Sequence, residues 1–228
     1  QVIVDRSKIK GQKVTILGSQ RSALGAARLL SHFGAQILIS ESSADKFSAD
    51  KRKLLTDIQA TFEFGYHSPD VLESDFIVVS PGIPENADIM LKIREQGIPV
   101  YSEIEVTSWF MDAPIIAVTG SNGKTTTVNL IHHLLQIAGY DSFLGGNVGV
   151  AASDVLLNSL TTEPKKPIFV LEVSSFQLDN IHSFKPQVAV ILNLSPDHLD
   201  RYPTLDAYYE SKLSILKNLD ADCTAIIN

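Results

Sequence analysis

The sequence contains a single cysteine, Cys223, among its 228 residues, so it cannot form a disulfide within the chain. It has no apolar run approaching the roughly 20 residues that a membrane-spanning helix needs. Its amino-terminal residues also lack the charged-then-apolar pattern of a secretory signal. A lone thiol is typical of a reducing compartment. We therefore expect a cytoplasmic protein with no membrane partner.

Basic residues are also scarce. The 19 Lys and Arg residues are outnumbered by 26 Asp and Glu, which leaves a net charge of −7. The densest basic cluster is Lys51-Arg52-Lys53, which we interpret as a solvated helix face. A protein that binds nucleic acid needs a basic surface for the phosphate backbone. We therefore expect no nucleic-acid partner, and we expect a monomer.

Short apolar runs are present instead, and helix-like segments separate them. The runs are continuous rather than alternating, which is typical of strands buried on both faces of a parallel sheet. The predicted strands are residues 13–18, 36–40, 76–80, 114–120, 167–173 and 188–193. The alternation of these predicted strands with helix-like segments predicts an α/β fold.

Two strand-glycine-helix units, at Gly18 and Gly120, indicate two domains. We expect a Rossmann-like parallel-sheet domain over residues 1–101 and a P-loop-type α/β ATPase domain over residues 102–228, with the boundary near Tyr101. The chain opens on Gln1 without a methionine and stops in a strand-like run, CTAIIN. We therefore expect the second domain to be truncated.

The first glycine loop, ILGSQRSALGAARLL, follows a strand and opens a helix, as a dinucleotide-binding loop does. The dinucleotide fingerprint itself fails, because Gln20 and Ala23 stand where it requires glycine. A pyrophosphate could still bind the free N–H groups at the start of the helix, with Arg21 adding a charged contact. A plain turn without a ligand is the alternative.

Two further signals follow predicted strands of the first domain. Glu41 stands where a ribose or base contact is common, although acidic loop residues are often only solvated. The segment SPGIPEN, residues 80–86, contains Gly82, which would let a ligand approach the backbone closely. A proline-bounded turn is the alternative for this segment.

The stretch AVTGSNGKTTT, residues 117–127, resembles a phosphate-binding loop but is two residues short. A Walker A loop would require glycine where Val118 stands. Gly120 and Gly123 still allow backbone N–H groups to approach phosphate oxygens. Lys124 supplies a charge for the β- and γ-phosphates, and the Thr125 hydroxyl can bind Mg²⁺.

Mg²⁺ usually needs a carboxylate as well, and Glu172, at the end of an apolar strand, is the candidate. Its burial would be costly without a partner, and a structural ion pair is the alternative to a metal. His198, in LNLSPDHLDRY, follows another strand and could bind a second cation or substrate, or be inert. Asn147, in the glycine-rich loop GGNVG, could hydrogen-bond a ligand.

Together, the motifs TGSNGKTTT, GGNVG, LEVSSFQL and LNLSPDHLDRY, followed by Lys212, resemble the ATP-dependent Mur ligases of peptidoglycan synthesis. The short loop G-x-x-G-K-[ST] belongs to this ligase group, which includes the folylpolyglutamate synthases. The first half is most similar to the D-glutamate-adding members, through LGSQRSALGAARLL, SPGIPENAD and SEIEVT. The family's first loop often has glycine where this chain has Ala23.

The resemblance implies a reaction that adds D-glutamate to UDP-N-acetylmuramoyl-L-alanine. ATP would phosphorylate the substrate carboxylate, and the amine would then attack the acyl phosphate. A third domain, absent from this chain, would bind D-glutamate. Without that domain we expect the chain alone to be inactive.

The resemblance also implies roles for individual residues. The loop would bind ATP, and Mg²⁺ would be held beside it; His198 and Lys212 would serve a second ion, Lys212 matching a lysine that the family carbamylates. The implied catalytic residues are Lys124, His198 and Lys212. The implied nucleotide-binding residues are Gly120, Ser121, Asn122, Gly123, Lys124, Thr125 and Thr126. The implied metal ligands are Thr125, Glu172, His198 and Lys212. The implied substrate-binding residues are Ser19, Gln20, Arg21, Ser22, Glu41, Ser80, Gly82, Asn147, Ser174 and Gln177.

Three alternatives remain at this point. Another Mur ligase or a folylpolyglutamate-synthase-like enzyme would differ in its first domain. A P-loop kinase or GTPase would need the two extra loop residues and would leave GGNVG and DHLDRY unexplained. The chain could also be a nucleotide-binding fragment without catalytic activity.

Overall fold

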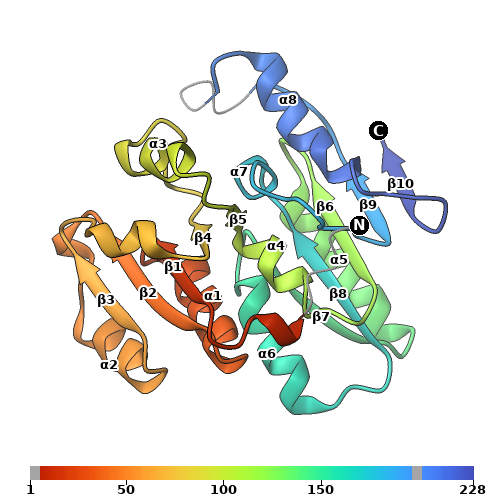
Figure 1. The fold of residues 1–228 in the computed structure, drawn as a ribbon. Helices are drawn as coiled ribbons and strands as arrows, with labels where there is room; N and C mark the ends of the chain where they lie inside the picture. Colours follow the sequence, from red (N-terminus) through yellow and green to blue (C-terminus); the bar gives the residue numbers. More distant parts are fainter. Residues whose placement is uncertain (1–5, 197–201) are drawn as a thin grey trace.

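The computed structural model describes residues 6–196 and 202–228, which form two parallel β-sheets that follow one another along the chain (Figure 1). The first sheet has the strand order β3-β2-β1-β4-β5, and the second has the order β10-β9-β6-β8-β7. Every strand pair in both sheets is parallel. The predicted α/β class is confirmed.

The first sheet consists of β1 (Lys13–Leu17), β2 (Gln36–Glu41), β3 (Thr61–Phe64), β4 (Phe76–Val79) and β5 (Val100–Ser102). Its helices are α1 (Arg21–His32), α2 (Ala49–Asp57), α3 (Asp88–Glu95) and α4 (Glu103–Ser108). The second sheet consists of β6 (Ile115–Thr119), β7 (Asp141–Gly146), β8 (Pro167–Glu172), β9 (Val188–Ile191) and β10 (Thr224–Ile227). Its helices are α5 (Lys124–Ile137), α6 (Ala152–Thr162), α7 (Ser175–Leu178) and α8 (Leu205–Leu213). Short 3₁₀ turns are η1 (Arg6–Lys8), η2 (Ala44–Lys46), η3 (Pro69–Glu73) and η4 (Ser214–Leu216).

Each of the six continuous apolar runs contains a strand, because the central strands are covered on both faces. β4, for example, is buried at all four of its residues. Sequence reasoning missed β3, β5 and β7. β5 is only three residues long, and β7 ends in two glycines, so neither has the apolar run that marks the other strands.

The two sheets share one hydrophobic core. Figure 1 shows α1, α4 and α6 near one another between the sheets, and each of these helices packs against the other two. One cluster of buried side chains runs from Ile16 and Ile39 in the first sheet to Phe169 and Leu171 in the second. The apolar contact therefore continues past Tyr101, which lies in β5.

Polar contacts add to this shared core. The Arg28 guanidinium of α1 donates two hydrogen bonds to the Asp154 carboxylate of α6, at 2.8 and 2.6 Å. This bidentate pair is only partly exposed, and its geometry is the strong form of an arginine–carboxylate contact. It joins α1, a helix of the first sheet, to α6, a helix of the second.

Apolar side chains remain uncovered on the outer part of the second sheet. β10 lies at the edge of the sheet, and Ile226 and Ile227 are 52% and 60% exposed. On α5, Leu130, Leu134 and Ile137 are also exposed, at the spacing of one helix face.

The described part of the chain contains no helix with the length and apolar character that a membrane span requires.

Candidate active site

The phosphate-binding candidate is the turn between β6 and α5, where two glycines adopt conformations that other residues rarely take. Gly120 has φ +148° and Gly123 has φ +84°. A Cβ on Gly120 would lie 3.1 Å from the Leu192 Cβ, so a side chain there would crowd the end of β9. The two glycines therefore keep this loop narrow and its backbone accessible.

The loop is tied to the segment that follows β9. The Ser121 and Asn122 amides donate to the Asn193 backbone carbonyl and side-chain Oδ1, at 3.1 and 2.8 Å. The first helical hydrogen bond of α5 runs from Thr127 N to Gly123 O, at 3.0 Å. The amides just before Thr127 therefore have no partner within the helix, and they are the donors available to an anion.

Two lysine side chains meet at one carbonyl of this loop. Lys124 Nζ donates to Gly120 O at 2.8 Å and to Ser121 O at 3.0 Å. Lys212 Nζ, from α8, donates to the same Gly120 O at 3.0 Å. Lys212 is 2% exposed, and its ammonium lies 4.8 Å from the centre of the Tyr208 ring. The fold thus brings together two predicted catalytic residues that are far apart in the sequence.

Glu172 lies directly beside the loop and is 2% exposed. Its Oε2 accepts a hydrogen bond from the Thr125 hydroxyl at 2.7 Å, and its Oε1 accepts one from Asn147 Nδ2 at 3.2 Å. None of the ion pairs among the described residues involves Glu172. The structural ion pair considered for this carboxylate is therefore not formed within the described part of the chain.

The glycine-rich loop GGNVG has a packing requirement of its own. Gly146 has φ +113°, and a Cβ there would lie 2.2 Å from the Glu172 backbone oxygen. Only glycine lets β7 end this close to β8. As a result Asn147 N donates to Glu172 O at 2.8 Å, and the Asn147 side chain reaches the Glu172 carboxylate.

The hydroxyl and carboxylate oxygens of Thr125 and Glu172 are ligand types that suit Mg²⁺, which takes few protein ligands and completes its shell with phosphate oxygens and water. A buried carboxylate with no ion-pair partner in the part of the chain that the structure describes fits such an ion. His198, the predicted ligand of a second ion, lies outside the described residues. Within the described residues no group of three or more His, Cys, Asp or Glu side chains converges on one point.

Ser174 and Gln177, both predicted to contact substrate, form a capping box at the start of α7. The Ser174 hydroxyl accepts from Gln177 N at 3.4 Å, and Gln177 Oε1 accepts from Ser174 N at 3.1 Å. Gln177 is buried. These hydrogen bonds give both side chains a local structural role at the beginning of the helix.

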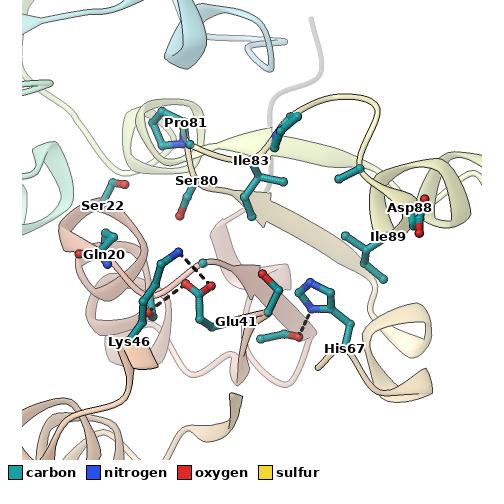
Figure 2. A pocket seen from close by; sticks show the side chains of 17 residues that line it. Gln20, Ser22, Glu41, Lys46, His67, Ser80, Pro81, Ile83, Asp88 and Ile89 are labelled. Carbon is teal, nitrogen blue, oxygen red and sulfur yellow. Dashed lines mark hydrogen bonds and ion pairs between the residues drawn. The ribbon is translucent and has the colours of Figure 1, made fainter. Parts of the chain in front are cut away.

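A second site is a cavity of about 410 Å³ at the carboxyl ends of the first sheet (Figure 2). Gly18, with φ +98°, opens it, because a Cβ there would lie 2.5 Å from the Ser80 Oγ. Six predicted substrate residues line the cavity: Ser19, Gln20, Ser22, Glu41, Ser80 and Gly82. The volume falls in the range of small-molecule sites.

Glu41 is 3% exposed in this cavity and is well supplied with donors. Burial raises the pKa of Glu41, but hydrogen bonds from Ser43 N, Lys46 Nζ and Ser19 Oγ outweigh it, and the pKa lies below its usual value. Glu41 is therefore ionised at neutral pH and paired with Lys46, at 3.1 Å. It is not the merely solvated acidic residue considered from the sequence.

Arg21 is not among the residues that line the cavity, although Gln20 and Ser22 on either side of it are. Its guanidinium donates to the Asn147 backbone oxygen at 2.5 Å, so it reaches from α1 to the glycine-rich loop of the second sheet. Lys46 and His67 line the cavity, and sequence reasoning did not single them out. Lys46 ends the 3₁₀ turn η2 and His67 lies in a loop; neither has a motif around it, so only their position in the fold marks them.

Residues 118–228 match the family model described as "Mur ligase middle domain". The chain is 41% identical over 217 residues to "UDP-N-acetylmuramoylalanine--D-glutamate ligase" of Salinibacter ruber, covering 92% of this chain and 46% of that protein. It is 38% identical over 222 residues to the protein of the same name from Geobacter sp. strain M21, covering 97% of this chain and 48% of that protein.

The predicted resemblance to the Mur ligase family is confirmed. The chain spans about half the length of these Mur ligase relatives. Solved structures agree at the level of the fold. UDP-N-acetylmuramate:L-alanyl-gamma-D-glutamyl-meso-diaminopimelate ligase of Neisseria meningitidis aligns with a TM-score of 0.63 at 19% identity, covering 96% of this chain and 71% of that chain. UDP-N-acetylmuramate-alanine ligase of Thermotoga maritima aligns with a TM-score of 0.54 at 18% identity, covering 95% and 49%.

Proposed function

We propose that the protein containing this chain is an ATP-dependent ligase that joins D-glutamate to UDP-N-acetylmuramoyl-L-alanine in peptidoglycan precursor synthesis. The observation that carries this proposal is the meeting of Lys124 and Lys212 at Gly120 O, beside the Thr125–Glu172 pair. Two positive charges, the first-turn amides of α5 and a carboxylate–hydroxyl pair therefore lie at the turn between β6 and α5. Transfer of a phosphoryl group between two anions requires groups of this kind, which position the phosphates and neutralise their charge.

The proposed chemistry starts from a carboxylate and an amine, which at neutral pH form a salt and not an amide. The carboxylate would take the γ-phosphoryl group of ATP, which releases ADP and gives an acyl phosphate. The amine would then attack the acyl carbon and displace phosphate. The amides of α5 and Lys124 would hold the β- and γ-phosphates. Thr125 and Glu172 would hold Mg²⁺, which supplies charge neutralisation between the two anions.

The remaining assignments belong to the same proposal. Lys212 would be the lysine that the family carbamylates, and its burial beside the loop supports this role. The cavity at the Gly18 turn would bind the UDP part of the substrate. We also propose that the boundary between the two domains lies near Tyr101. D-Glutamate would bind a part of the full-length protein that corresponds to the half of the relatives' length this chain does not match. We propose a cytoplasmic monomer.

The test of this function is Lys124→Ala in the full-length enzyme. Loss of the ammonium beside the phosphates should reduce phosphate release by at least about a thousandfold, because removal of one such charge costs several kcal/mol of transition-state stabilisation. Binding of UDP-N-acetylmuramoyl-L-alanine, measured by calorimetry, should remain. Lys165→Ala, an exposed lysine of the same sheet unit, is the matched control. Near-normal turnover of Lys124→Ala would contradict the assignment.

A further inference from the structure

The cavity at the carboxyl ends of the first sheet has two chemically different ends. The Gly18 turn and the start of α1 provide small polar groups, as a pyrophosphate site does. The other end is formed by Ile83, Ile89 and His67. Figure 2 shows these three side chains at one end of the cavity, with Glu41 between them and the start of α1. A nucleotide with its phosphates at α1 and its ribose near Glu41 would place its base beside His67.

The hydrogen bonds behind His67 determine which ring nitrogen carries the proton. Ser40 Oγ donates to Glu63 Oε1 at 2.5 Å, and this uses the only hydrogen of the hydroxyl. His67 Nδ1 lies 2.6 Å from the same Ser40 Oγ. The hydroxyl has only lone pairs left for this contact, so His67 Nδ1 must be the donor. Glu63 is held in turn by Ser68 N, which donates to its Oε1 at 2.9 Å.

A neutral imidazole with its proton on Nδ1 has a lone pair on Nε2. Burial lowers the pKa of His67, and the nearby charges of Glu63 and Glu41 oppose this shift only in part, so the ring is neutral at neutral pH. His67 lines the cavity, and its Nδ1 is the nitrogen engaged with Ser40, so Nε2 is the nitrogen left for a ligand. The cavity therefore contains a hydrogen-bond acceptor of fixed orientation beside two isoleucine side chains.

We propose that His67 Nε2 selects the base of the nucleotide by accepting the ring N–H of uracil, with Ser40 and Glu63 as positioning residues that hold the required tautomer. This inference rests on the proposed function, which brings a uridine nucleotide to the cavity. Uracil has a hydrogen on N3, whereas cytosine has a lone pair there. Cytosine would set one lone pair against another and leave a buried acceptor unpaired.

The experiment is calorimetric titration of the chain with UDP, with CDP, and with UDP methylated at N3 of the base. The wild-type chain should bind UDP at least about tenfold more tightly than either analogue, the effect of one lost hydrogen bond. In His67→Phe, which keeps an aromatic ring but no acceptor, this preference should fall below about threefold. Ser40→Ala retains the imidazole and releases its tautomer, so it should lose most of the preference as well.

His32→Phe, a matched change of an exposed histidine at the end of α1, should keep the wild-type preference. Thermal unfolding followed by circular dichroism checks that each variant is folded. An unchanged UDP preference in both folded variants would overturn the role of His67 and leave the proposed function intact. Equal binding of UDP and CDP by the wild-type chain would do the same. No UDP binding by the wild-type chain would overturn both proposals.

Discussion

At the scale of single residues, Glu103 is a carboxyl group whose surroundings favour its neutral form. It is 2% exposed, and Ser153 donates to its Oε1 from both the backbone N, at 2.7 Å, and the side-chain Oγ, at 2.5 Å. Its Oε2 is buried without a hydrogen-bond partner among the described residues. Burial raises the pKa of Glu103, and the Ser153 hydrogen bonds offset this only in part.

Because the folded protein binds this proton more tightly than the unfolded chain, Glu103 costs stability as pH rises above its ordinary pKa of 4.5. Glu103→Gln keeps an acceptor for Ser153 and does not titrate. We expect the variant to be more stable than wild type by about 1 kcal/mol at pH 7, with the difference vanishing near pH 4. Urea unfolding at pH 4, 5.5 and 7 measures this, with exposed Glu95→Gln as control. An equal loss of stability at every pH would contradict it.

At the scale of helices and strands, the close approach of α1 and α6 depends on Gly25. A Cβ there would lie 2.5 Å from Ser153 Oγ and 3.1 Å from the Ala151 Cβ. The serine cannot turn away freely, because its hydroxyl donates to Glu103. Glycine at position 25 therefore lowers the intrinsic stability of helix α1, but it allows α1 and α6 to approach this closely.

Gly25→Ala should accordingly lower stability, although alanine is the better helix former by about 1 kcal/mol. Overpacking costs about 1–3 kcal/mol, so we expect a net loss of about 1 kcal/mol and a lower melting temperature. Differential scanning calorimetry measures this. Gly82→Ala is the matched control, because a Cβ at Gly82 meets nothing within 4 Å and its φ is ordinary. A melting temperature at or above that of wild type would refute the steric argument.

At the scale of the whole molecule, one carboxylate joins the two sheets. Glu105 of α4 is fully buried, and the backbone amides of His182, Ser183 and Phe184 donate to it at 2.8 to 3.1 Å. The Ser183 hydroxyl and Trp109 Nε1 donate to it as well. Every neighbour is a donor, so the site requires a group that only accepts.

Glu105→Gln would place amide hydrogens against these donors. We expect it to lower the free energy of unfolding by about 3 kcal/mol and to separate the unfolding of the two sheets into two calorimetric transitions. The Glu95→Gln variant again serves as control. A single transition at the wild-type temperature would show that the coupling of the two sheets does not depend on Glu105.

Sequence patterns predicted the features that are local in the chain. The apolar runs of β1, β4, β6 and β8 and the glycines at 120 and 123 could be read directly, because strand and loop conformation depend mainly on neighbouring residues. Partners from distant segments could not be found in this way. Arg21 donates to Asn147 O, 126 residues further along the chain, and the contacts of Asn193 with Asn122 and of His67 with Ser40 also join separate segments.

The uncovered strand β10 has a consequence for handling the chain in solution. A strand edge with exposed Ile226 and Ile227 is a template onto which another copy can pair. At neutral pH the net charge of −7 keeps copies apart by repulsion. Near the isoelectric point of about 5.3 this colloidal protection disappears, and the apolar face of α5 adds to the attraction. Moderate salt screens the same repulsion, so it also favours association of the copies in a concentrated sample.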